Sequence, residues 1–84
     1  MFQLAIITPS GKVFEDNVDS ISALGVDGGF EVFSGHVPML IALKDGQIKI
    51  RKSGGKDQII NTASGILEVN QNHDVIALLD SANS

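Results

Sequence analysis

The sequence contains no cysteine. This absence excludes a disulfide scaffold, a zinc site built on thiolates and thiol redox chemistry by the protein itself. Metal ligation would then depend on carboxylates and on the two histidines, His36 and His73. These two lie in separate connectors, without the H-x-H or H-x-x-x-H spacing of paired ligands, and a site normally needs three or four ligands. We therefore expect no metal site.

Basic residues are also scarce. The chain has 6 Lys and Arg residues against 10 Asp and Glu residues, for a net charge of −4. Proteins that bind DNA or RNA neutralise backbone phosphates with basic side chains, and an acidic balance opposes this. The charge therefore predicts no nucleic-acid partner.

Long hydrophobic runs are missing as well. No stretch approaches the roughly 18 apolar residues that would indicate a membrane-spanning helix. The amino-terminal segment lacks a basic region, and Gln3 and Pro9 interrupt its apolar residues, so it resembles a first strand and not a signal peptide. These features predict a soluble protein without a cofactor, found inside the cell.

Apolar residues are nevertheless abundant for a chain of this size. They make up 43% of 84 residues, with a mean hydropathy of +0.18. A chain of this length forms one small domain, here residues 1–84, and buries only about 60% of its unfolded surface. Some of the apolar load is therefore expected to face a partner.

The apolar residues alternate with polar ones or form short runs, and Gly, Pro, Asn and Asp interrupt them every 8–12 residues or so. No segment has the 3.6-residue period of an amphipathic helix. The pattern predicts an all-β fold, a small antiparallel β-sandwich of about 8–10 short strands. A short piece at Val13–Phe14 is possible, and the end, Ser81 to Ser84, is expected to fray. The expected strands are Phe2–Thr8, Asp19–Val26, Phe30–Phe33, Met39–Leu43, Gln47–Lys52, Gln58–Ala63, Ile66–Val69 and Val75–Asp80.

Several of these strands are apolar on both faces. In Met39–Leu43, one face carries Met39, Ile41 and Leu43 and the other Leu40 and Ala42. A small sandwich has one interior, so the second face must meet another protein or be hidden by barrel-like curling of the sheet. The pattern leaves both possibilities open.

No arrangement of residues indicates a catalytic centre. Ser34 and His36 are two residues apart in a segment with Gly35 and Pro38, which favour a turn and not an aligned nucleophile and base. The glycine-rich connectors match neither phosphate-binding pattern, and the acidic cluster at Glu15, Asp16 and Asp19 is typical of a solvated surface. The segment Ser34 to Pro38 is then either a rigid structural loop or a recognition loop.

The order of motifs along the chain resembles a known family. The segment GFEVFSGHVPMLIALKDGQIKI, residues 29–50, is similar to the G-H-x-P region of the epsilon subunit of bacterial and chloroplast F-type ATP synthases. The later segments ASGILEV (63–69) and VIALLDSA (75–82) resemble that family's S-G-G-[FI]-x-E-V and V-x-[VI]-L-A-[DE]-x-A motifs, and LAIITPSGKVF (4–14) resembles its first hairpin. The resemblance covers essentially the whole chain.

This resemblance implies a ten-strand sandwich with no active site of its own. It would be a central-stalk subunit of a rotary, proton-translocating ATP synthase, joining the gamma subunit to the cytoplasmic loops of the c-ring. Such a subunit is peripheral to the membrane, on the cytoplasmic side of an inner or thylakoid-like membrane. By position, Thr8, Gly29 and His36 would face the c-ring. Met39, Leu40, Ile41 and Leu43 are the expected contacts with gamma.

The sequence departs from the family in two ways. Gly29 and Glu31 stand where relatives often have an acidic residue and a glycine, so contacts with the ring are expected to differ locally. Relatives also usually continue into a two-helix domain implicated in ATP sensing and inhibition. The 84 residues do not contain its motif, so ATP binding is not expected of them.

Two other classes of function compete with this one. A free-standing β-sandwich that binds a small ligand or a protein would also tolerate strands with two apolar faces. An enzyme comes third, because no catalytic arrangement is found.

Overall fold

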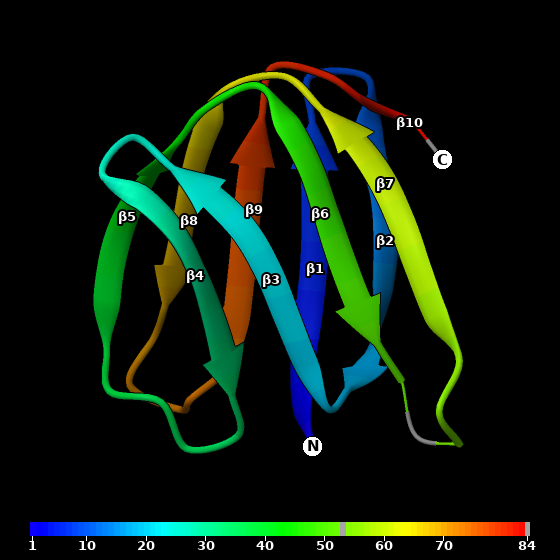
Figure 1. Ribbon diagram of the computed structural model, residues 1–84, viewed down its shortest axis with the longest axis vertical. Helices are drawn as coiled ribbons and strands as arrows, with labels where there is room; N and C mark the ends of the chain where they lie inside the picture. The colour runs from blue at the N-terminus through cyan, green and yellow to red at the C-terminus, as the bar shows by residue number, and fades with distance from the viewer. Residues whose placement is uncertain (53, 84) are drawn as a thin grey trace.

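The computed structural model describes residues 1–52 and 54–83, and within them it contains ten strands and no helix (Figure 1). No helix capable of crossing a membrane is therefore found in these residues. The strands are β1 (Phe2–Thr8), β2 (Gly11–Val18), β3 (Ser20–Gly25), β4 (Gly28–Phe33), β5 (Met39–Leu43), β6 (Gly46–Arg51), β7 (Asp57–Thr62), β8 (Gly65–Val69), β9 (Val75–Leu79) and β10 (Ala82–Asn83).

The strands form two layers of one nearly closed sheet (Figure 1). The front layer contains β4, β3, β6, β7 and β10, and the rear layer contains β5, β8, β9, β1 and β2. The layers join where β3 meets β5 through the single register pair Gly25 and Leu43. Two backbone hydrogen bonds of 3.0 Å flank this pair, from Val26 N to the Ala42 carbonyl and from Lys44 N to the Leu24 carbonyl.

Successive strands run in opposite directions, so the connectors alternate between two ends of the sandwich (Figure 1). We call the end with the connectors after β1, β3, β5, β7 and β9 the Thr8 end, and the opposite one the His36 end. Strands β1 and β9 are separated by an even number of connectors and therefore run the same way. They pair in parallel, from Leu4 with Val75 to Ile7 with Leu78, which is the one departure from the predicted antiparallel pairing in the described residues.

The core lies between the two layers. Every second side chain of a strand points inward and contributes to it. Fully burying one such aliphatic side chain contributes about 1.5–3 kcal/mol to folding. The largest side chains that are fully buried are Leu4, Ile6, Ile21, Ile48, Ile50, Ile60 and Leu67.

The predicted strands agree with the observed ones to within two residues, and Phe2–Thr8 and Met39–Leu43 have the predicted bounds. One prediction was too short and another was wrong. The short piece at Val13–Phe14 is an eight-residue strand, β2, and Ala82 and Asn83 do not fray because they pair with Thr62 and Asn61 of β7. Ser84, which was also expected to fray, and Ser53 of the β6–β7 connector lie outside the described residues.

Candidate functional site

The outer side of the rear layer carries a continuous row of aliphatic side chains. The strand register places Ala42 beside Ile66, Ile66 beside Leu78, and Leu78 beside Ile7, across four strands. Leu40 and Ile76 lie on the same side in the adjacent row, with Glu68 between them. We call Ile7, Leu40, Ala42, Ile66, Ile76 and Leu78 the apolar face.

The apolar face is open to solvent. Leu40 is 69% exposed, Leu78 54% and Ile66 44%. Contiguous exposed apolar surface on a small domain indicates a site that another molecule covers. Curling of the sheet hides part of the second apolar face: Ile7 and Ile76 are half-buried, whereas Leu40, Ile66 and Leu78 stay exposed.

The outer side of the front layer differs in chemistry. Lys49 and Arg51 of β6 both form ion pairs with Asp57 of β7, at 3.3 and 3.2 Å. These interactions with Arg51 and Lys49 lower the pKa of Asp57 from its ordinary value. Ile59 interrupts the charged residues as an exposed apolar side chain. Leu24 and Phe33 are also exposed on this side. The front layer thus mixes ion pairs with separate apolar side chains, whereas the rear layer carries a continuous aliphatic row.

Three hollows border the apolar face. The first, of about 400 Å³, lies between the β3–β4 turn and Leu40 to Ala42. The second, of about 720 Å³, lies between Leu40 and the β8–β9 turn, and the third, of about 310 Å³, between Ile7 and Leu78. A partner on the apolar face would find depressions along its edges.

The structure separates the four residues predicted to contact gamma. Leu40 lies on the apolar face, whereas Leu43 is 4% exposed and belongs to the core. Met39 and Ile41 are half-buried and pack against the core. The alternation of side chains was predicted correctly, but the sequence does not say which face of β5 points inward. Ile66 and Leu78 were absent from the predicted set, although their strands had the same two-faced pattern.

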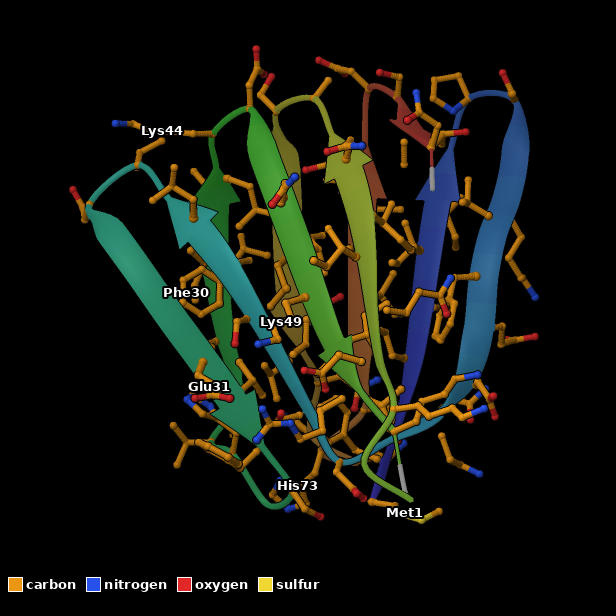
Figure 2. The ribbon with its side chains drawn as sticks, turned by 45° about the vertical axis from the view of Figure 1, so that its right-hand side comes forward. Met1, Phe30, Glu31, Lys44, Lys49 and His73 are labelled. Carbon is orange, nitrogen blue, oxygen red and sulfur yellow. The ribbon has the colours of Figure 1, made fainter. Side chains whose placement is uncertain are left out.

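The three residues expected on one rim do not share it. Thr8 ends β1 and Gly29 follows the β3–β4 turn, so both lie at the Thr8 end, as does Lys44 in Figure 2. His36 lies in the β4–β5 connector at the opposite end, where Figure 2 also shows Met1 and His73. The reason is the alternation of connectors: with β2 a full strand, the fourth connector is opposite to the first and third.

The loop with His36 is held by backbone and terminal contacts. His36 Nδ1 lies 2.8 Å from the Val37 carbonyl, and His73 Nδ1 lies 2.9 Å from the His36 carbonyl. The Ser34 hydroxyl donates to the Met1 carbonyl and accepts from its amine, so these contacts form no Ser34–His36 dyad. Among the described residues, His73 is the one non-glycine residue with a positive φ, which is 64°. The β4–β5 and β8–β9 connectors are therefore tied together.

The charged side chains of the described residues form ion pairs at the surface. Within residues 1–52 and 54–83, no three His, Asp or Glu side chains are placed to hold a metal ion. Asp16 pairs with Lys52 at 3.0 Å, and hydrogen bonds from Lys52 and from Asn17 N lower its pKa. Lys52 also lies 5.4 Å from the centroid of the Phe14 side chain. These contacts fasten β2 to the segment after β6 at the surface.

One family model matches the whole chain, and two solved structures share its fold. The family model for the ATP synthase delta/epsilon chain, beta-sandwich domain, matches residues 1–84. A chain of the Euglena gracilis mitochondrial ATP synthase, solved as OSCP, F1 and c-ring, is similar in structure with a TM-score of 0.90 at 21% identity. A chain of the Tetrahymena thermophila mitochondrial ATP synthase central stalk and c-ring has a TM-score of 0.83 at 14% identity. Each match covers 96% of this chain, but this chain spans only 51% and 64% of those two.

Proposed function

Because the chain belongs to the family of ATP synthase delta/epsilon chain beta-sandwich domains, we propose that it works as a non-catalytic coupling element of the central stalk. In this proposal it binds the gamma subunit on one side and the cytoplasmic loops of the c-ring on another. It thereby helps to transmit rotation driven by proton translocation, and it is peripheral to the membrane through the complex.

The apolar face is the observation that carries the proposal. Leu40, Ile66 and Leu78 expose large aliphatic side chains on adjacent strands of the sheet. Covering such side chains gains about 25 cal/mol per Å² of apolar area removed from water. We assign gamma to this face, so that Leu40 is a direct contact and Met39, Ile41 and Leu43 support it from within.

The Thr8 end suits contact with the c-ring loops. Thr8 and Gly29 both lie there, and the connectors at this end carry Asp27, Lys44, Asp45 and Asp80. Three carboxylates against one amine favour loops with basic side chains. His36, at the opposite end, is assigned no ring contact in this arrangement.

The test is binding of the domain to the gamma subunit of the same complex, measured by size-exclusion chromatography and by calorimetry. Leu78→Asp should raise Kd at least about tenfold, because it places a charge in the centre of a buried contact. Ile59→Asp is the matched control: Ile59 is 49% exposed, close to the 54% of Leu78, but lies on the front layer. A folded wild-type domain that does not bind gamma would overturn the proposal.

A second function is favoured by one observation. The hollow of about 400 Å³ between the β3–β4 turn and β5 has the volume of a small-molecule pocket. A free-standing ligand-binding module would bind its ligand in this hollow and would bind no partner on the apolar face. Saturable binding of a metabolite by a domain that ignores gamma would support it.

A further inference from the structure

Strand β4 is an edge of the sheet. Within the described residues it pairs with β3 alone. In an antiparallel pair, every second residue turns its N–H and C=O away from the neighbouring strand. The Phe33 carbonyl accepts a hydrogen bond of 3.3 Å from His36 N, which places Phe33 in the outward set. By alternation, Glu31 and Gly29 also point their backbone groups outward.

Strand β5 faces this edge with free backbone groups of its own. The Ala42 carbonyl bonds Val26 N, so the even-numbered residues of β5 turn their backbone toward the β3–β4 hairpin. Leu40 is two residues earlier and has the same orientation. In the part of the chain that the structure describes, the register between β3 and β5 ends after Gly25 and Leu43. The sheet is therefore open between β4 and β5.

The hollow of about 400 Å³ fills this opening, and its walls suit a polypeptide backbone. Gly28 and Gly29 form one wall; a Cβ at Gly28 would have no atom within 4 Å, and at Gly29 the nearest is 3.9 Å away. The half-buried Phe30 and Ile41 line the inner side. Figure 2 shows the Phe30 side chain inside the sandwich beside β4.

Two carboxylates mark the ends of this stretch of β4. Asp27 lies in the turn before the strand, and Glu31 lies within it. Neither belongs to the ion pairs found in residues 1–52 and 54–83, which involve Glu15, Asp16 and Asp57 on the acidic side. Glu31, however, lines a hollow on the outer side of the front layer together with Lys49 and Arg51. A segment that lies along β4 would therefore gain from a Lys or Arg near Asp27, at the turn.

We propose that an extended segment of the partner on the apolar face adds to the free edge of β4 as an additional strand. Its backbone pairs with Gly29 and Glu31, its apolar side chains contact Phe30 and Leu40, and a basic residue meets Asp27. Strand addition to an exposed edge is a general mode of peptide recognition. The inference rests on the proposed function, because Leu40 and Ala42 line both the hollow and the apolar face.

Amide hydrogen exchange of the 15N-labelled domain, alone and bound to gamma, tests the pairing directly. Strand addition should slow exchange of the Gly29 and Glu31 amides at least about tenfold in the complex, because those N–H groups become hydrogen-bonded. The Phe30 and Val32 amides already face β3 and should change much less. Equal slowing of all four would indicate general stiffening and would count against the pairing.

A pair of variants isolates the backbone group. Glu31→Pro removes the outward N–H, which costs the isolated fold no ladder bond because proline is tolerated on a strand edge. Glu31→Ala removes the same carboxylate and keeps the N–H. We expect Glu31→Ala to change Kd by less than about threefold and Glu31→Pro to raise it at least tenfold more, with both variants as stable as the parent.

The outcomes separate the two proposals. Binding of gamma with unchanged exchange at Gly29 and Glu31, and equal Kd for the two variants, would overturn strand addition and leave the coupling function standing. Absence of binding by the wild-type domain would overturn the coupling function itself. Concentration-dependent protection of Gly29 and Glu31 without gamma would assign the edge to a second copy of the chain and overturn the proposal.

Discussion

Gly65 shows how narrowly single residues are specified in this sandwich. It opens β8 opposite Leu79 of β9. A Cβ there would collide with the Leu78 carbonyl oxygen and would lie 2.8 Å from Leu79 Cα. The backbone of β9 cannot move aside without disturbing its pairing with β1, so this glycine is required by close approach of two strands.

Gly65→Ala is therefore expected to destabilise the domain by about 1–3 kcal/mol, the usual cost of overpacking. Urea unfolding followed by circular dichroism measures this. Gly46→Ala is the control, since a Cβ at Gly46 meets Leu24 Cδ2 at an ordinary 3.7 Å. Equal stability of the two variants would show that β8 and β9 separate easily.

Leu40 and Leu43 show what alternation in a sequence leaves undecided. Both lie on β5, yet one is 69% exposed and the other 4%. The period of two predicts that they face opposite sides, but only the packing of β5 against the rest of the core decides which is inside. For the same reason, the predicted gamma contacts combined surface and core residues.

Leu43→Ala should cost about 2–5 kcal/mol of folding free energy, as expected for a fully buried leucine. Leu40→Ala should change stability by less than about 0.5 kcal/mol, because it alters an exposed position. Thermal or urea unfolding of both variants measures the difference. Similar losses at the two sites would mean that Leu40 is covered in solution.

At the scale of elements, the sequence predicts strands well where the strand is half-buried and poorly where pairing alone holds it. In β2 only Val18 is buried and Phe14 half-buried, so the strand has no clear alternation and is stabilised by its ladder with β1. Strand β10 has two residues and depends on β7. Because the sequence did not show that β2 is a full strand, the number of strands stayed uncertain. The end of the sandwich at which each connector lies was therefore also uncertain.

The hairpin of β6 and β7 gives the clearest pH dependence. Arg51 and Lys49 lower the folded-state pKa of Asp57 below its ordinary 3.8. A lowered pKa means that the stabilisation is fully present above the unfolded value and is lost as pH falls through the folded value. The wild type should lose stability below about pH 4 more steeply than Asp57→Asn, as acid titration of the unfolding free energy would measure. Parallel curves would show that the ion pairs have no effect in solution.

At the scale of the whole molecule, the two layers differ in surface character. The apolar face is continuous over four strands of the rear layer, whereas the exposed apolar side chains of the front layer stand among charged residues. Without a partner, the apolar face is the surface through which copies of the domain should associate.

We therefore expect the isolated domain to self-associate at high concentration, and Leu78→Asp to reduce this association. Sedimentation velocity over a concentration series measures both. Ile59→Asp, on the front layer, should leave the concentration dependence unchanged. A domain that stays monomeric at millimolar concentration would mean that the apolar face alone drives no association.

The parallel pairing of β1 with β9 also determines how the domain responds to mechanical force. The chain enters β1 at the His36 end and leaves β9 at the Thr8 end (Figure 1). Once the two residues of β10 detach, tension between the start of β1 and the end of β9 would slide β1 along β9. The bonds between Leu4–Ile7 and Val75–Leu78 would then be loaded together in shear and not broken one at a time. A sandwich connected in this way resists stretching along its strands.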